Sequence, residues 1–131
     1  MLEKLKKCNY IYYNANPLGR EVNDCSVRAI SLAEGASWDE TYDKLSSYAK
    51  ENGMILDEAR FIEPYLNSKY KMVYYRCRRC SPKNLGDLLK VYNKGIYLIT
   101  MKGHITCSIN GVVYDTWDCT NRTVWCIWKV R

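Results

Sequence analysis

The dipeptide Asn110-Gly111 constrains the fold of this 131-residue chain more than any other feature, because strand-like runs lie on both sides of it. These runs are residues 104–109 and 112–117, both rich in β-branched and aromatic residues. Asn-Gly is the pair that most readily adopts the positive φ angles of a two-residue hairpin turn. The sequence therefore predicts an antiparallel hairpin in which Ile109 pairs with Val112.

Helix signals gather earlier in the chain. One helix is predicted to begin after Asp24 as its N-cap and to end at Gly35. A second follows at once, because Ser37 and Glu40 have the spacing of a capping box. A short helix is predicted within residues 57–67 and limited by Pro64.

A fourth helix is predicted to begin with Ser81 as cap and Pro82 in its first turn, and to run to Gly95. Further strands are predicted at residues 72–76, 96–101 and 124–130. Helices thus precede an antiparallel sheet, which favours an α+β fold. The length indicates one domain, residues 1–131, with residues 1–20 as an extended lead-in segment.

Composition limits the cellular compartment in which we expect the protein. No run approaches the roughly 20 apolar residues of a membrane helix, and the basic start lacks the apolar stretch of a secretory signal. We therefore expect a cytoplasmic protein with no membrane partner. The seven cysteines are odd in number, so we expect mostly reduced thiols. We attribute the net charge of +6 mainly to basic residues on the solvated surface.

Cys25 is the candidate nucleophile. It directly follows the predicted cap, in the first turn of the first helix. A helix N-terminus presents free N–H groups and the positive end of the helix dipole, and both lower a thiol's pKa. The same N–H groups can hold an oxyanion. The alternative is a buried cysteine that only fills space in the core.

His104 is the only histidine and therefore the only candidate for an imidazole base. In the predicted hairpin, Thr106 faces Asp115 and His104 faces Trp117, and these four side chains share one face. Asp115 lies diagonal to His104, where it could orient the imidazole and stabilise its charged form. The alternative is that Asp115 is a polar residue at a strand end.

A cysteine on the first helix, a histidine on a later strand and an acidic residue on the next strand resemble the chain order of papain-like and NlpC/P60-like cysteine peptidases. The segment from Asn23 to Ala29 is also similar to a motif in small papain-fold proteins of bacteria and their phages. Gly103-His104 and Asp115-Thr116 match the later parts of that pattern. The resemblance covers about residues 20–117.

The resemblance implies a reduced papain-like core and acyl transfer from an amide or isopeptide through a thioester, without a cofactor or metal. It implies a peptide or protein substrate, and a phage-encoded protein of this kind would act on a host protein. The glutamine that often completes the oxyanion hole is replaced by Gly19, and the chain contains no glutamine. Asn23, Asn16 or a second backbone N–H could substitute, and Asn23 is favoured. Val27 stands where NlpC/P60-like enzymes have glycine.

Two other interpretations stay open. Cys77 and Cys80 have zinc-ligand spacing, and Cys119 and Cys126 could complete four sulfurs. The second is a catalytically inactive papain-fold module that binds a protein, or less favourably a nucleic acid, through its basic and tyrosine residues. The residues that would serve such binding are Arg76, Arg78, Arg79, Tyr74 and Tyr75.

Overall fold

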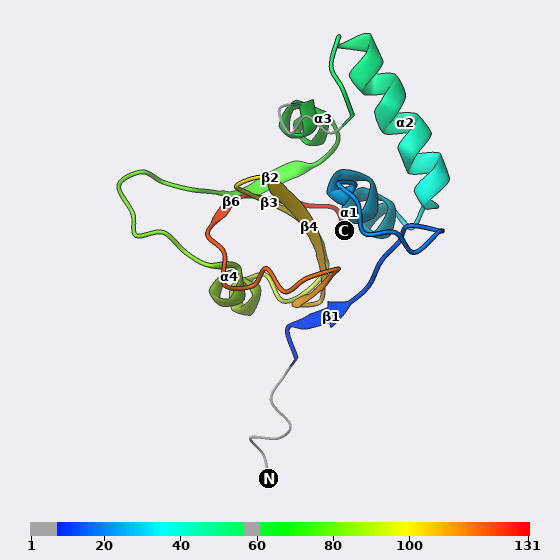
Figure 1. Ribbon diagram of the computed structural model, residues 1–131. Helices are drawn as coiled ribbons and strands as arrows, with labels where there is room; N and C mark the ends of the chain where they lie inside the picture. Colours follow the sequence, from blue (N-terminus) through cyan, green and yellow to red (C-terminus); the bar gives the residue numbers. More distant parts are fainter. Residues whose placement is uncertain (1–7, 57–60) are drawn as a thin grey trace.

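Figure 1 shows the computed structural model, which describes residues 8–56 and 61–131. Within these residues the chain forms four helices and six strands. The helices are α1 (Cys25–Glu34), α2 (Trp38–Glu51), α3 (Ile62–Lys69) and α4 (Leu85–Val91). The strands are β1 (Tyr10–Tyr12), β2 (Lys71–Tyr75), β3 (Ile96–Met101), β4 (His104–Ile109), β5 (Val112–Asp115) and β6 (Val124–Lys129).

All six strands belong to one sheet in the order β1-β5-β4-β3-β6-β2. β1 runs parallel to β5, and the other neighbours are antiparallel. The predicted α+β class is thus confirmed, but the sheet is mixed rather than purely antiparallel. The reason is that part of the lead-in segment, Tyr10–Tyr12, pairs with the edge strand of the hairpin.

Helices cover both faces of the sheet (Figure 1). α1, α2 and α3 bury their apolar side chains against one face, where Leu98, Ile105 and Trp128 point. The short helix α4 packs against the opposite face, where Ile99 and Ile127 point. The alternation of Leu98 and Ile99 between the two clusters follows from the period of two along a strand. The central strands are therefore buried on both sides.

The hairpin is formed as the sequence predicts. Ile109 pairs with Val112, and the turn residues Asn110 and Gly111 have φ angles of 50° and 81°. Both angles lie in the left-handed region that Asn-Gly tolerates best. The second strand ends at Asp115, two residues earlier than predicted. Asp115 is therefore the last residue of β5, and the chain leaves the sheet directly after it.

The first helix begins and ends, and the second helix begins, where the sequence places them. α1 ends at Gly35, whose φ of 67° permits the left-handed conformation of a C-cap. α2 begins after Ser37, and both hydrogen bonds of the capping box with Glu40 are present. One detail of α1 was wrongly predicted, since Asp24 is the N-cap residue but its side chain makes no capping hydrogen bond.

The other two helices differ from their predicted bounds. Part of the helix predicted within residues 57–67 lies outside the described residues. The described helix α3 does not stop at Pro64, which is its third residue. Proline is tolerated there because the N–H groups of a first turn need no helical partner. α4 begins after Asn84, whose side chain accepts a hydrogen bond from the N–H of Asp87.

β6 contains a bulge opposite β3. Thr100 pairs with Cys126 and Met101 pairs with Val124, so Trp125 has no partner across the ladder. A bulge of this kind turns one side chain away from the regular alternation. It brings the Trp125 indole to a cavity between β3 and α3. None of the described helices has the length and apolar character needed to cross a membrane.

Candidate active site

Cys25 is the first residue of α1, at the turn where helix geometry leaves backbone N–H groups without helical partners. The carboxylate of the preceding Asp24 would ordinarily cap such groups, but here it makes no capping hydrogen bond. The N–H groups around Cys25 thus stay available for another acceptor. The thiol is partly buried and packs against the apolar cluster beneath α1.

Asp24 instead binds three side chains away from the helix end. Its Oδ1 accepts a hydrogen bond from Arg28 Nε at 2.8 Å. Its Oδ2 accepts hydrogen bonds from Trp38 Nε1 at 2.9 Å and from Asn16 Nδ2 at 3.3 Å. Asp24 is buried, so these partners offset the cost of removing a carboxylate from water. They also fix the loop that delivers Cys25.

His104 begins β4, and its Nε2 lies 2.6 Å from Oδ2 of Asp115 at the end of β5. The hairpin register predicts this diagonal contact, and the structure contains it. The ring of Trp117 lies 4.8 Å from the imidazole, centroid to centroid, and is tilted by 47° against it. With Nε2 held by Asp115, Nδ1 is the nitrogen left for a second partner.

The other oxygen of Asp115 is also occupied. Oδ1 accepts hydrogen bonds from Arg28 Nη1 at 2.8 Å and from the N–H of Thr116 at 2.7 Å. Burial by itself would raise the pKa of Asp115, but the hydrogen bonds from His104 and Arg28 outweigh burial and lower that pKa to about 2. Asp115 is therefore an ionised carboxylate inside the protein, shared between an imidazole and a guanidinium.

The ionisation of Cys25 and of His104 is linked. Burial opposes the charged form of His104, but its hydrogen bond with Asp115 and the nearby thiols of Cys119 and Cys25 raise its pKa to about 11. Burial likewise opposes the thiolate, yet the interaction with His104 lowers the pKa of Cys25. Each group thus favours the charged form of the other, which is the condition for a thiolate–imidazolium pair.

Cys119 is a second thiol at this centre. It is fully buried, and its Sγ lies 3.9 Å from Oδ2 of Asp115. The possible ligand atoms of His104, Asp115 and Cys119 all lie within 4.8 Å of one another. This trio could bind a thiophilic metal such as zinc only if the short hydrogen bond between His104 and Asp115 opened.

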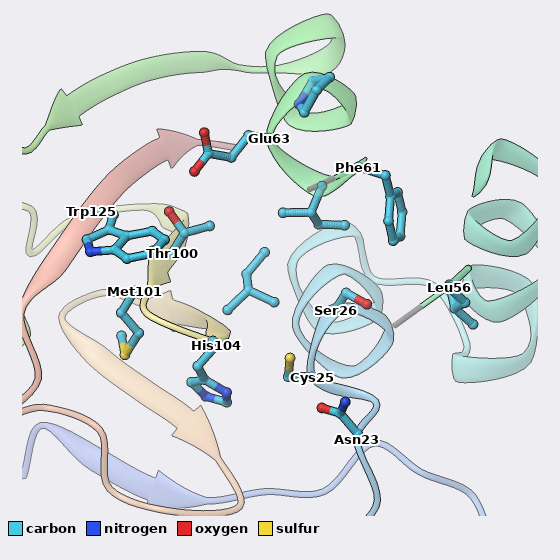
Figure 2. A pocket seen from close by; sticks show the side chains of 14 residues that line it. Asn23, Cys25, Ser26, Leu56, Phe61, Glu63, Thr100, Met101, His104 and Trp125 are labelled. Atoms are coloured by element: carbon cyan, nitrogen blue, oxygen red, sulfur yellow. The ribbon is translucent and has the colours of Figure 1, made fainter. Parts of the chain in front are cut away.

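A cavity of about 660 Å³ opens beside the thiol and the imidazole. Figure 2 shows Cys25 and His104 on adjoining walls of it, with Asn23 beside Cys25. Most of the remaining wall is apolar. The lining residues beyond these three include Leu56, Phe61, Ile62, Pro64, Met101, Ile105 and Trp125. A substrate carbonyl could reach the sulfur from this side.

The structure thus brings some of the residues proposed from the sequence together and leaves others apart. Cys25, His104 and Asp115 form a connected row, and Asn23 lies at the cavity beside Cys25. Asn16 does not take an oxyanion position, because its amide binds Asp24. Cys77 and Cys80 lie in a turn after β2, and within the described part of the chain neither belongs to a possible metal-binding group.

Sequence reasoning missed the role of Arg28. Its side chain is buried and bridges Asp24 on its own helix and Asp115 on β5. A signal for it was present, because Arg28 lies among Val27, Ala29 and Ile30 on a helix that must bury those apolar residues. An arginine at such a position needs buried anionic partners.

Comparison of the chain with protein families, with curated proteins and with solved structures gives no match, so the geometry of the site has to carry any functional proposal.

Proposed function

We propose that the protein is a papain-like cysteine hydrolase that cleaves an amide or isopeptide bond through a thioester on Cys25. The observation that carries the proposal is the hydrogen bond between His104 and Asp115, next to a thiol whose pKa the same imidazole lowers. An isolated buried cysteine would have a raised pKa, as Cys107 does, where burial raises it to about 12. The contrast favours a nucleophile at Cys25 over a cysteine that only fills space.

The proposed mechanism uses the pair in its charged form. The Cys25 thiolate attacks the carbonyl carbon of the substrate, and a C–S bond forms. Protonated His104 gives its proton to the leaving nitrogen as the C–N bond breaks. Water, deprotonated by His104, then attacks the thioester, releasing a carboxylic acid and restoring the thiolate. An amine in place of water would make the protein a transamidase.

Two groups are proposed to stabilise the oxyanion. The uncapped backbone N–H groups at the start of α1 lie next to the sulfur. The Asn23 amide lines the same cavity and would add a side-chain donor. Asp115 would act behind His104, holding its ring in place and stabilising the imidazolium.

A peptide substrate is favoured by a second hollow next to the first. This cavity, of about 750 Å³, shares Asn23, Ser26 and Leu56 with the cavity at the thiol. Exposed apolar side chains line it, among them Leu18 and Ile55. An extended chain could therefore pass the start of α1 with contacts on both sides of Cys25, which a small metabolite would not need.

The direct test is site-resolved alkylation with iodoacetamide over a pH series, read by peptide mass spectrometry. Cys25 is expected to react at pH 6, well below the ordinary pKa of a thiol, and to slow at least tenfold in His104→Ala. Cys77 is a matched internal control, because its pKa is also lowered but by the backbone of Arg79 and the thiol of Cys80, not by His104. Its rate should not change in that variant.

The opposite result would be a Cys25 that reacts no faster at pH 6 than the buried Cys107, with or without His104. That outcome would contradict the hydrolase and favour the inactive binding module. The module would bind through the basic turn that follows β2, and its binding would weaken with salt.

A further inference from the structure

The cavity beside Cys25 changes character from one end to the other. Near the thiol and along its walls it is lined by apolar groups such as Leu56, Ile62 and Ile105. Farther away, Glu63 from α3 and Thr100 from β3 line it together with Trp125 from β6 (Figure 2). An apolar passage with a polar end selects for side chains that are themselves apolar along the stem and polar at the tip.

Glu63 adds a negative charge at the same end. It lies in the first turn of α3 and lines the cavity. Burial and then the charge of Glu63 raise the pKa of the Cys126 thiol, which places the carboxylate near the strand position that pairs with Thr100. A carboxylate accepts charge-assisted hydrogen bonds, so a cationic donor that enters the cavity would pair with it.

Trp125 completes this end of the cavity. Regular alternation along β6 is broken at Trp125, which the bulge leaves without a partner on β3. Its indole therefore lies beside Thr100 and Met101 at the cavity (Figure 2). The face of an indole attracts cations more strongly than the ring of any other side chain. Bulges of this kind are frequent next to functional sites, where they aim one side chain.

We propose that this end of the cavity is a subsite for a lysine or arginine side chain of the substrate, one or two residues from the scissile bond on its acyl side. The aliphatic stem contacts the apolar walls, and the cationic head binds Glu63 and the face of Trp125. A neutral aliphatic side chain of equal length leaves the carboxylate without a partner. This inference rests on the proposed function, because it assigns substrate specificity to the same site.

The test uses peptidyl chloromethyl ketones, which alkylate a cysteine nucleophile after binding in the substrate site. Two tripeptide ketones carry lysine at the first or the second residue from the ketone, and each is matched by a ketone with norleucine there. Norleucine has the stem of lysine without the charge. At one of the two positions, lysine should label Cys25 at least tenfold faster than norleucine. Equal rates at both positions would overturn the subsite.

Variants separate the charge from the shape of the cavity. Glu63→Gln should lower the lysine-to-norleucine rate ratio about tenfold, as expected for a charged group losing its counter-charge. Glu51→Gln, at the exposed end of α2, is the matched control and should leave the ratio unchanged. A ratio that survives Glu63→Gln would also overturn the subsite.

The two proposals fail in different ways. If iodoacetamide and every ketone label Cys25 no faster than the buried Cys107, the hydrolase itself is contradicted, and the subsite falls with it. If Cys25 reacts fast with iodoacetamide but the ketones show no preference for lysine, the hydrolase stands and only the subsite is wrong.

Discussion

Arg28 Nη1 donates a hydrogen bond to Oδ1 of Asp115 at 2.8 Å, while His104 binds the other oxygen of the same carboxylate. Arg28 lies one turn after Cys25 on α1, so the helix that carries the thiol is tied directly to the carboxylate behind the imidazole. The same guanidinium also binds Asp24, which precedes Cys25. The spacing between the thiol and the imidazole is thus set by a buried ion-pair network and not by apolar packing alone.

Replacing Arg28 should weaken both the fold and the site. Arg28→Met leaves the buried Asp24 without a cationic partner and Asp115 with His104 as its only one, and we expect a loss of about 3 kcal/mol in the free energy of unfolding. Arg28→Lys keeps the charge, but a single ammonium lacks the planar fork that reaches Asp24 and Asp115 together, so it should recover only part of the loss. Urea unfolding measures both. Arg79→Met, in the exposed turn after β2, should change stability by less than about 0.5 kcal/mol; a similar loss in this control would refute the network.

Asp115→Asn should shift the pH dependence of the thiol. The carboxylate raises the pKa of His104, so its removal lets burial lower that pKa again. A less stable imidazolium then stabilises the Cys25 thiolate less, and the pKa of the thiol rises. At pH 6 the alkylation of Cys25 should slow by about tenfold for each unit of that rise. Asp118→Asn, three residues beyond the end of β5, is the control, and a matching shift there would argue against a specific role of Asp115.

Stability should depend on pH in two windows. The pKa of Asp115 is lowered from 3.8 to about 2, so its stabilisation is complete above 3.8 and is lost as the pH falls through about 2. The pKa of His104 is raised from 6.5 to about 11, so its stabilisation is complete below 6.5 and declines as the pH rises toward 11. Urea midpoints should therefore be highest between about pH 4 and 6.5.

The alkaline range has to be measured in a variant without the Cys25 thiol. The lowered pKa of this thiol makes stability rise with pH, which is opposite to the effect of His104. Measurements in Cys25→Ser remove that contribution. A midpoint that stays constant from pH 6.5 to 10 in this background would show that His104 carries no stabilising charge.

The start of α2 offers a test of the fold apart from the site. Ser37→Ala removes the hydroxyl that accepts a hydrogen bond from the N–H of Glu40, and should cost about 1 kcal/mol of unfolding free energy. Ser47→Ala, at an exposed position inside the same helix, should be neutral or slightly stabilising, because alanine is the better helix former. Equal effects of the two changes would show that the capping box contributes nothing.

Elements governed by neighbouring residues were predictable from the sequence. The hairpin follows from Asn110-Gly111 and the strand-like runs on both sides of it, and the start of α2 follows from Ser37 and Glu40. The predicted start of α4 was wrong because two local signals compete. Ser81-Pro82 is a good helix start, but Asn84 caps Asp87 and also forms a bridge with Thr123, a contact with a distant segment. Tertiary pairing decided between them, and no local pattern contains it.

The candidate site likewise contains contacts that the sequence predicts and contacts that it does not. The contact between His104 and Asp115 could be predicted because both lie on one hairpin, where register fixes which side chains meet. The bond between Arg28 and Asp115 joins positions 87 residues apart in the chain. Predicting it requires knowing which side of α1 packs on which strand. The polar end of the cavity depended likewise on the bulge at Trp125, which no nearby residue signals.

The number of contacts that Asp115 makes has an evolutionary consequence. Its side chain binds His104 and Arg28, and its main-chain oxygen accepts hydrogen bonds from the N–H of Tyr13 and the hydroxyl of Tyr10. Cys25 supports no such network, so its sulfur could be replaced at little structural cost while the acid is retained. If the protein is the proposed hydrolase, relatives that keep the aspartate and the arginine but carry serine or alanine in place of the cysteine would have lost the activity and kept the fold.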